Sequence, residues 1–469
     1  MQELVANFTD TISGWLYGYI LVFLLSGVGI YFTVRLACGQ VTNLGHMFRL
    51  LGETTSTAKH ENGITPFKAF CISAASRIGT GNIVGVAVAI SLGGPGAVFW
   101  MWVLAFLGGA SSFIESTLAQ IYKVKNPDGT YRGGPAYYIT QVLGSKKIAY
   151  LFAVIICITY GFCFNAMQAN TLAGAAKTTL HLPTWTTGLI LALLAGWIFF
   201  GGVHRIADVT GKIVPVMAVM YIFVALFVFV KNISFVPEMF AMIFKNAFGL
   251  QEFGGAAIGV TVIQGVKRGL FSNEAGMGSV PNAAATADTS HPAKQGFVQS
   301  LGVYVDTWFV CTATAFIVLL GGQDFYGGDL QGLEITQQAL ANEVGSWGIT
   351  FLSICIFLFA FSSIIGNYYY GESNIGFMGG NKTHLNIFRI LCCCLLFLGS
   401  IGDFSIVWNF GDIFMGIMAI INLIVILKIG GIALETYQDY KAQLKAGKDP
   451  EFHSGRIKSI TTPLEAWDE

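Results

Sequence analysis

Two short stretches, RIGTGNIVG (Arg77–Gly85) and RGLFSNEAG (Arg268–Gly276), decide how this chain folds. They share the frame R-x4-N-x2-G, and each lies inside a long apolar segment. A helix interior loses roughly 1 kcal/mol for each Gly relative to Ala, and Asn and Thr side chains compete for the backbone's hydrogen bonds. Both segments are therefore predicted to unwind at these points.

The composition around the two stretches is that of a membrane protein. Of the 469 residues, 54% are hydrophobic and 11% are charged, whereas charged residues make up about 25% of a soluble protein. The nine Cys include the run Cys392–Cys394, which has no spacing suited to zinc and is interpreted as buried thiols. The acidic N-terminus lacks the basic region of a cleavable signal peptide, so the first apolar segment is expected to remain as a helix.

Eleven apolar segments are long enough to cross a hydrocarbon core of about 30 Å, which takes about 20 residues. They lie near residues 14–37, 65–92, 96–122, 148–176, 183–201, 212–230, 253–289, 297–321, 347–370, 385–401 and 408–429. Lipid offers no partner for free backbone amides, and the segments lack the alternation of barrel strands. The fold class predicted is an all-α polytopic membrane protein with eleven transmembrane helices.

The positive charges of the loops predict the orientation. Lys and Arg gather in one set of connections and in the C-terminal tail, whereas only Lys177, Lys231 and Lys245 fall on the other side. This pattern puts the N-terminus outside and the tail in the cytoplasm. The acidic, amphipathic segment Gly321–Gly345 is then external and is expected to form a short interfacial helix. The charged tail is expected to be partly helical and partly disordered.

The two interrupted segments also predict a function class. Unwound backbone at membrane depth is tolerated only where protein encloses it or where it lines a watery cavity. A Gly-interrupted span at matching positions of two halves indicates the central site of a secondary transporter. Residues 65–232 and 253–429 form two five-helix blocks of opposite orientation, after an extra helix and connection in 1–64 and before a tail in 430–469. The alternative is two unrelated Gly-rich kinks.

Three long motifs in this order resemble the alanine or glycine:cation symporter family, the sodium:alanine symporters of bacteria. They are AASRIGTGNIVGVAVAISLGGPGAVFWMW (Ala74–Trp102), NPDGTYRGGPAYYI (Asn126–Ile139) and GVKRGLFSNEAGMGSVPNAAATA (Gly265–Ala287). The resemblance covers residues 15 to 435. It implies a LeuT-type fold of five plus five inverted helices behind one extra helix. It also implies sodium-coupled uptake of a small neutral amino acid, L-alanine with D-alanine or glycine as further substrates, across the bacterial inner membrane.

An alanine zwitterion needs donors for its carboxylate, acceptors for its ammonium group and a limit on side-chain size. Amides near Gly81 and Asn82, at a helix N-terminus, suit the carboxylate. Carbonyls near Gly269 and Phe271 suit the ammonium group. The expected substrate-binding residues are Ile78, Gly79, Thr80, Gly81, Asn82, Phe164, Gln168, Gly269, Phe271, Ser272, Asn273, Gly276 and Asn367. Phe164 and Gln168 share a helix face, and simple helix packing is the alternative for them.

Sodium prefers oxygen ligands, by analogy with calcium and magnesium. The LeuT-type resemblance implies a sodium ion held by carbonyls of the first core helix, here at Gly79, and by the hydroxyl pair Ser362 and Ser363. Hydroxyls inside a membrane helix more often bond to the helix backbone, which is the alternative. Asn367 stands where the family often has Trp, and this departure makes a polar substrate such as glutamine conceivable.

Charges inside membrane spans are costly and indicate function. Arg77 and Arg268 flank the expected site, and they are candidates for inner and outer gates that pair with Glu115, Asp306 or Glu274. Structural ion pairing is the alternative. Glu274 is also a candidate proton acceptor if the coupling ion is a proton.

Other function classes have less support. The chain has no nucleotide loop, no H-E-x-x-H and no G-x-S-x-G, and its seven His show no metal-ligand spacing, so no enzyme activity and no cofactor beyond sodium are expected. The zero net charge argues against nucleic acid. A passive channel is a further alternative, because channels also contain broken helices. Among transporters, the second interpretation is a sodium- or proton-coupled symporter for glutamine or another polar neutral amino acid.

Overall fold

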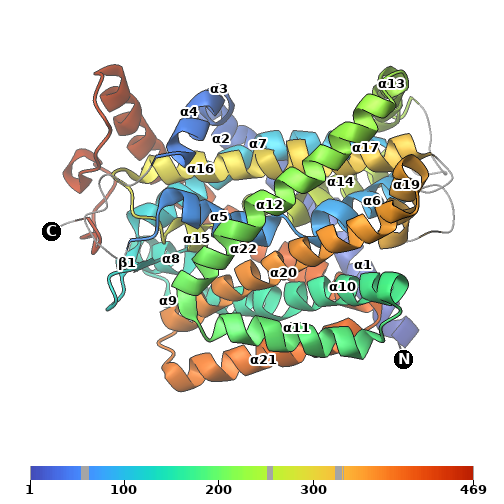
Figure 1. Ribbon diagram of the computed structural model, residues 1–469. Helices are drawn as coiled ribbons and strands as arrows, with labels where there is room; N and C mark the ends of the chain where they lie inside the picture. Colours follow the sequence, from blue (N-terminus) through green and yellow to red (C-terminus); the bar gives the residue numbers. More distant parts are fainter. Residues whose placement is uncertain (1, 54–62, 251–256, 323–329, 331, 468–469) are drawn as a thin grey trace.

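The computed structural model describes residues 2–53, 63–250, 257–322, 330 and 332–467 (Figure 1). In chain order its elements are α1 (Gln2–Trp15), η1 (Leu16–Leu21), α2 (Val22–Arg35), α3 (Gly39–Thr42), α4 (Leu44–Leu51), α5 (Pro66–Arg77), η2 (Gly81–Gly85), α6 (Val86–Gly93), α7 (Gly96–Ile121), β1 (Val124–Lys125), β2 (Tyr131–Arg132), α8 (Pro135–Leu143), α9 (Lys146–Ile156), η3 (Cys157–Phe164), α10 (Asn165–Leu180), α11 (Thr184–Phe199), α12 (Gly202–Lys231), α13 (Val236–Ala247), α14 (Ile258–Asn273), α15 (Pro281–Ala284), α16 (Pro292–Tyr304), η4 (Val305–Cys311), α17 (Thr312–Gly321), α19 (Leu333–Val344), α20 (Trp347–Phe377), α21 (Lys382–Ile401), α22 (Phe404–Lys445) and η5 (Ser454–Arg456).

The long helices run side by side along one direction and form a bundle with two ends (Figure 1). We call one the hairpin end, because it carries the antiparallel hairpin of β1 and β2, together with α4 and the C-terminus. The opposite end carries α13, α19 and the N-terminus. The predicted helix in Gly321–Gly345 corresponds to α19, although residues 323–329 and 331 of that segment lie outside the described residues.

Eight helices in the described part of the chain are long and apolar enough to cross a membrane, which makes this a multi-pass membrane protein. They are Asn7–Arg35, Gly96–Ile121, Lys146–Leu180, Gly202–Lys231, Pro292–Gly321, Trp347–Phe377, Lys382–Ile401 and Phe404–Lys445. A ninth candidate is the pair α5 and Gly81–Gly93, bent by 51°. The two remaining predicted segments, 183–201 and 253–289, contain the shorter helices α11 and α14, and the predicted start of the second one at 253 lies outside the described residues.

Several spans are interrupted by π-helical turns rather than built as regular α-helices. The turn η2 contains Asn82, η3 ends at Phe164, and η4 contains Asp306. Such turns release backbone groups from the regular helical pattern and are frequent at functional sites. Three separate helices therefore loosen where residues of the expected site lie.

The C-terminal tail corrects one expectation. The tail is helical up to Lys445, as predicted, but residues 446–467 follow a defined course over the hairpin end instead of being disordered. Phe452, Ile457 and Leu464 from this segment are buried. The charged composition of the tail hid these three apolar side chains, which are spaced too far apart to form a helical stripe.

Candidate functional site

The first break separates α5 from the helix that follows it. Thr65 caps the start of α5 by accepting from the Lys68 amide at 3.2 Å, and Pro66 occupies the first turn. The helix ends at Arg77, since Ile78 leaves the helical conformation at φ −81° and ψ 86°. The side chain of Asn82 then turns back, and its Oδ1 accepts from the Gly79 amide at 2.9 Å. The break is thus a local, capped unwinding.

The second break follows α14 and uses left-handed backbone. Glu274 has φ 57°, and Gly276 and Gly278 have φ 81° and 80°, a region that favours glycine. The amides of these two glycines donate to the two carboxylate oxygens of Glu115 on α7, each at 3.1 Å. Asn422 on α22 donates to the same carboxylate at 2.7 Å and to the Gly276 carbonyl at 2.9 Å. The protein itself satisfies these backbone groups of the second break.

The two breaks meet at a group of small and aromatic residues. A Cβ atom on Gly81 would lie 2.8 Å from the Phe271 ring, so only glycine allows this approach. The Phe271 ring packs edge-on against Phe164 at 4.9 Å between centroids. A side chain on Gly79 would collide with the Ser363 hydroxyl and the Gln168 amide. The structure therefore brings together residues of α5, η2, η3, α10, α14 and α20 that the sequence separates widely.

Two polar groups face the unwound stretch of the first break. The Gln168 Oε1 atom accepts from the Thr80 amide at 3.1 Å. The Thr80 hydroxyl is fully buried and has no hydrogen-bond partner among the described residues. Because a buried unpaired hydroxyl costs about 1–3 kcal/mol, this atom marks a place where a polar ligand would be stabilised.

Ser363 lies against carbonyl oxygens at the end of α5. Its Oγ is 2.8 Å from the Ala75 carbonyl oxygen, 3.3 Å from that of Ser76 and 3.4 Å from that of Ile78. Ser362 instead donates to the Phe359 carbonyl of its own helix at 3.0 Å and to the Met217 sulfur at 3.3 Å. The Gly79 carbonyl accepts from the Asn82 amide at 3.2 Å. The oxygen-rich position thus lies at Ser363 and the turn before Gly79.

A second oxygen-rich cluster lies beside η2. The Asp306 carboxylate accepts from Asn82 Nδ2 at 2.6 Å, from Ser272 Oγ at 2.6 Å and from Thr307 Oγ1 at 3.0 Å. Asn82 Nδ2 also lies 2.9 Å from Ser272 Oγ. All four side chains are fully buried. Asn82 therefore links the first break to Asp306, and its amide group is already engaged within the protein.

A third cluster lies on the hairpin side of the first break. Ser76 Oγ is 2.7 Å from a carboxylate oxygen of Glu274 and 2.6 Å from the side-chain oxygen of Asn367. Glu274 also accepts from Ser279 Oγ at 2.8 Å. The Asn367 Nδ2 group is fully buried and has no partner among the described residues. Asn367 therefore keeps one half of its amide unused.

Arg268, the arginine before the second break, lines a cavity and pairs with a buried carboxylate. Arg268 forms two contacts of 3.2 Å with the Asp412 carboxylate, and Lys267 reaches the same carboxylate at 2.7 Å. These cations also line a cavity of about 680 Å³, whose wall includes Trp408, Gly332 and Asp10. Arg268 lies 5.1 Å from the Trp408 ring centroid, and Trp408 packs on Phe271 at 5.4 Å. Arg268 and Trp408, which line the cavity, thus connect it through ring contacts to Phe271 at the meeting point of the breaks.

The arginine before the first break behaves differently. Arg77 donates to the Gln299 carbonyl at 3.0 Å and to the Ser112 hydroxyl at 3.3 Å. The expected carboxylates are not its direct partners: within the described residues, neither Glu115, Asp306 nor Glu274 pairs with Arg77 or Arg268. Glu115 and Glu274 instead hold the second break, and Asp306 holds Asn82 and Ser272.

Not all expected substrate residues face the meeting point. Gly269 lies against α7, where a Cβ atom would be 3.1 Å from Leu104. Asn273 caps its own turn and donates to Thr307 at 3.2 Å, and Gly276 lies against Leu423. The helical period of α14 turns Gly269 and Asn273 toward other helices, whereas Phe271 and Ser272 point to the breaks.

Sequence reasoning missed Asp412 and Ser76. Asp412 lies inside the predicted segment 408–429, so the rule that charges within spans are functional would have found it. Ser76 has no such signal, because a serine in a membrane helix is common and its role depends on Glu274 and Asn367, which are distant in sequence.

Comparisons with known proteins show the family of this chain. The model of the sodium:alanine symporter family matches residues 1–454. The chain is 48% identical to the amino-acid carrier protein AlsT of Bacillus subtilis, over 100% of this chain and 99% of that protein. It is also 48% identical to the probable sodium/glutamine symporter GlnT of Bacillus subtilis, over 100% and 97% of the two chains.

Two further similarities are more distant. The sodium/alanine symporter AgcS of Methanococcus maripaludis is 36% identical over 91% of this chain and 95% of that one. A manganese transporter of Eremococcus coleocola has a similar fold, with a TM-score of 0.51 at 12% identity over 87% of both chains. The family match covers nearly the whole chain, and the relatives are carriers and symporters. This chain belongs to the sodium:alanine symporter family, a family of membrane transporters.

Proposed function

We propose that this protein is a sodium-coupled symporter that imports a small neutral amino acid, alanine or glycine, by alternating access. The supporting observation is the meeting of two helix breaks at Gly79, Gly81 and Phe271, with the unpaired Thr80 hydroxyl beside them. We further propose eleven spans with a five-plus-five inverted repeat in the bacterial inner membrane. The N-terminus is outside and the hairpin end is cytoplasmic, in keeping with the positive charges of the loops.

The amino acid is assigned to the meeting point of the breaks. Its carboxylate lies at the start of the helix formed by η2 and α6, where the helix dipole and the Thr80 hydroxyl favour an anion. Its ammonium group lies toward the carbonyl end of α14, near Phe271. The edge-on rings of Phe164 and Phe271, with Ile78, limit the side chain to a small group.

Sodium is assigned to the oxygen-rich position at Ser363. The carbonyls of Ala75 and Ile78 and the Ser363 hydroxyl supply oxygen ligands of the kind that hard cations prefer. This assignment replaces the expected ligand Gly79 with carbonyls of the turn before it. Ser362 then lies next to the ion but does not bind it. Sodium there would hold α20 against the end of α5. Because Ile78 and Gly79 also border the amino-acid site, the ion would order that site and raise its affinity, which is reciprocal coupling.

Glutamine is the second candidate substrate, and Asn367 is the observation that favours it. Its Nδ2 group is buried and has no partner in the part of the chain that the structure describes, and such a donor is complementary to the side-chain carbonyl of glutamine. The name of one 48% identical relative also refers to glutamine. Such a pocket would favour glutamine over alanine, because bound alanine would leave the buried Asn367 donor unpaired, which is costly.

Radiolabelled uptake into proteoliposomes tests these assignments. We expect alanine to accumulate above equilibrium under an inward sodium gradient and not under a matched potassium gradient. Unlabelled glycine should compete, and leucine should not. Uptake of glutamine but not alanine would move the substrate to the second candidate. Accumulation under a proton gradient without sodium would contradict the coupling ion, and a lack of accumulation under every gradient would contradict symport.

A further inference from the structure

The last part of the chain folds back over the hairpin end of the bundle. After α22 ends at Lys445, Gln443 exchanges hydrogen bonds with the backbone of Glu451 at 2.9 and 3.0 Å, which turns the chain around. Phe452, Ile457 and Leu464 are 6%, 2% and 1% exposed. We call residues 449–467 the strap. Its apolar side chains give it a fixed seat, because burying each one contributes about 1.5–3 kcal/mol.

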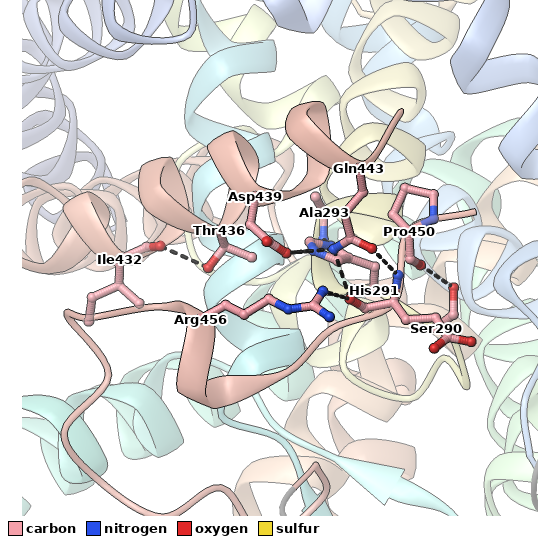
Figure 2. Close-up of polar contacts among 10 residues, drawn as sticks. Ser290, His291, Ala293, Ile432, Thr436, Asp439, Gln443, Pro450 and Arg456 are labelled. Atoms are coloured by element: carbon pink, nitrogen blue, oxygen red, sulfur yellow. Dashed lines mark hydrogen bonds and ion pairs between the residues drawn. The ribbon is translucent and has the colours of Figure 1, made fainter. Parts of the chain in front are cut away.

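The strap first contacts the start of α16. The Phe452 amide donates to the Ser290 carbonyl, and the Ser290 hydroxyl donates to the Pro450 carbonyl, both at 2.9 Å. Lys294 pairs with Asp449 at 2.8 Å. Figure 2 shows Ser290 and His291 facing the end of α22 and the strap. This part of the strap therefore ties α22 to the segment that enters α16.

His291 adds a hydrogen bond to the same junction. Its Nδ1 accepts from the Ala293 amide at 3.2 Å, and its Nε2 lies 3.3 Å from the Asp439 carboxylate (Figure 2). A ring nitrogen that accepts carries no proton, so the imidazole is neutral and Nε2 donates to Asp439. Burial lowers the pKa of His291, in agreement with this form.

The strap next contacts the end of α7. The Trp467 indole donates to the Gln120 carbonyl at 2.9 Å, and its ring centroid lies 4.8 Å from the Lys123 ammonium. The Glu465 carboxylate accepts from the Lys125 amide at 3.0 Å. The strap thus reaches from α16 to the hairpin.

Gln120 at the end of α7 and Lys123 just after it also hold the segment that follows α15. The Gln120 side chain donates to the Ala287 carbonyl at 2.9 Å, and Lys123 donates to the same carbonyl at 2.8 Å. On its other side, Ala287 forms a parallel bridge with Ile64, and the Asp288 amide donates to the Ile64 carbonyl at 2.8 Å. Ile64 lies directly before Thr65, the N-cap residue of α5. We call this contact between residues 64 and 287–288 the seam.

The seam joins the inner halves of both broken helices. Residues 64–77 lead into the first break from the hairpin end, and residues 279–288 lead away from the second break to the same end. A Cβ atom on Gly63 would lie 2.8 Å from the Asp288 carboxylate, so the two chains are in close contact. If α5 moves away from α15 to open a path to the hairpin end, the Asp288–Ile64 hydrogen bond must break.

We propose that the strap is a conformational brake, which stabilises the seam through Gln120, Lys123 and Ser290 and so holds the inner gate closed. The term inner gate rests on the proposed transport function, whereas the contact of strap and seam does not. The Lys294–Asp449 ion pair adds little to this contact, because Asp449 is 66% exposed and exposed pairs contribute about 0–1 kcal/mol. The strap is therefore held mainly by its buried apolar side chains and by its hydrogen bonds to Gln120, Lys125 and Ser290.

Hydrogen exchange of the Asp288 amide, measured on the purified protein in detergent, tests the proposal. We compare the unaltered chain with Trp467→Ala and with a chain that ends after Gly447. Lys448→Ala is the matched control, because Lys448 is an exposed residue next to the strap. We expect exchange in a peptide covering 285–289 to be several-fold faster in both strap variants and unchanged in the control. Thermal unfolding in detergent shows whether the bundle remains folded.

The readouts separate the strap from the transport function. Unchanged exchange in both folded strap variants would overturn the proposal. Faster exchange that spreads to α10 and α21, far from the strap, would also overturn it, because the strap would then be a general stabilising segment. Faster exchange confined to the seam supports it, even if no amino acid is accumulated. Where uptake occurs, we further expect faster efflux from proteoliposomes loaded with alanine, and slower efflux in the truncated chain would contradict a brake.

Discussion

The two helix breaks share a sequence frame, but their polar groups have different partners. At the second break, the Glu115 carboxylate accepts from the Gly276 and Gly278 amides and from the Asn422 side chain. At the first break, no described residue pairs with the Thr80 hydroxyl, and three carbonyls lie near the Ser363 hydroxyl. The second break is a turn held by side chains of other helices, whereas the first leaves the Thr80 hydroxyl without a partner among the described residues. A shared pattern of Gly and Asn therefore does not give the two breaks the same hydrogen-bond partners.

The arginines before the two breaks differ in the same way. Arg268 shares a fully buried carboxylate, Asp412, with Lys267, whereas Arg77 donates to a carbonyl and a hydroxyl. Removing one partner of a buried ion pair costs about 3–5 kcal/mol, because a charge is left uncompensated. The second break should therefore be more sensitive to the loss of a single charge than the first.

The largest effect is expected for Asp412→Asn. This change leaves Lys267 and Arg268 facing each other without a carboxylate, and it should lower the free energy of unfolding by about 3 kcal/mol or more. Thermal unfolding in detergent measures the loss. Asp208→Asn is the control, since Asp208 forms an exposed pair with Lys68 and should change stability by less than about 0.5 kcal/mol. Equal stabilities of the two variants would show that the buried pair does not hold the second break.

A smaller loss is expected for Glu115→Gln. Glutamine offers one carbonyl oxygen, so its NH2 group would face one of the two glycine amides. A buried group left unsatisfied costs about 1–3 kcal/mol, and uptake should fall along with stability. Glu334→Gln on the exposed face of α19 is the control. If Glu115→Gln were as stable as this control, the second break would not depend on the Glu115 carboxylate.

At the first break we expect loss of binding. Gly79→Ala places a methyl group against the Ser363 hydroxyl and the Gln168 amide, and it should weaken amino-acid binding about tenfold or more, which corresponds to about 1.4 kcal/mol. Binding of radiolabelled alanine to purified protein measures this. Gly174→Ala is the control, because no atom lies within 4 Å of its added Cβ. A large fall in stability without loss of affinity would reverse the contrast between the breaks.

The smallest expected effect distinguishes the two serines. Ser363→Ala removes the hydroxyl that faces the Ala75 and Ile78 carbonyls, and it should raise the sodium concentration for half-maximal uptake several-fold. Ser362→Ala removes a hydroxyl bonded to its own helix and should change this value less. Sodium titrations of uptake compare them. An equal shift in both variants would place the ion between the two hydroxyls, and no shift in either would remove it from α20.

Several features followed from the sequence alone. Long apolar segments must form helices in lipid, and a helix is found in each of the eleven predicted segments. Gly79 and Gly81 predicted the first break, because glycine destabilises a helix wherever it occurs. The family was equally evident, since long motifs carry it and the comparisons confirm it. These are local properties, fixed by residue type and spacing.

Only the tertiary structure decided which polar groups form hydrogen bonds within the protein and which have no partner there. Asn82 was expected to face a ligand, yet its amide is bound to Asp306 and Ser272. The Asp412 partner of Arg268 and the course of residues 446–467 likewise depend on contacts between distant helices. A side chain's hydrogen-bond partners are set by distances of about 3 Å between elements. No sequence pattern encodes such distances, because they arise only when the helices pack.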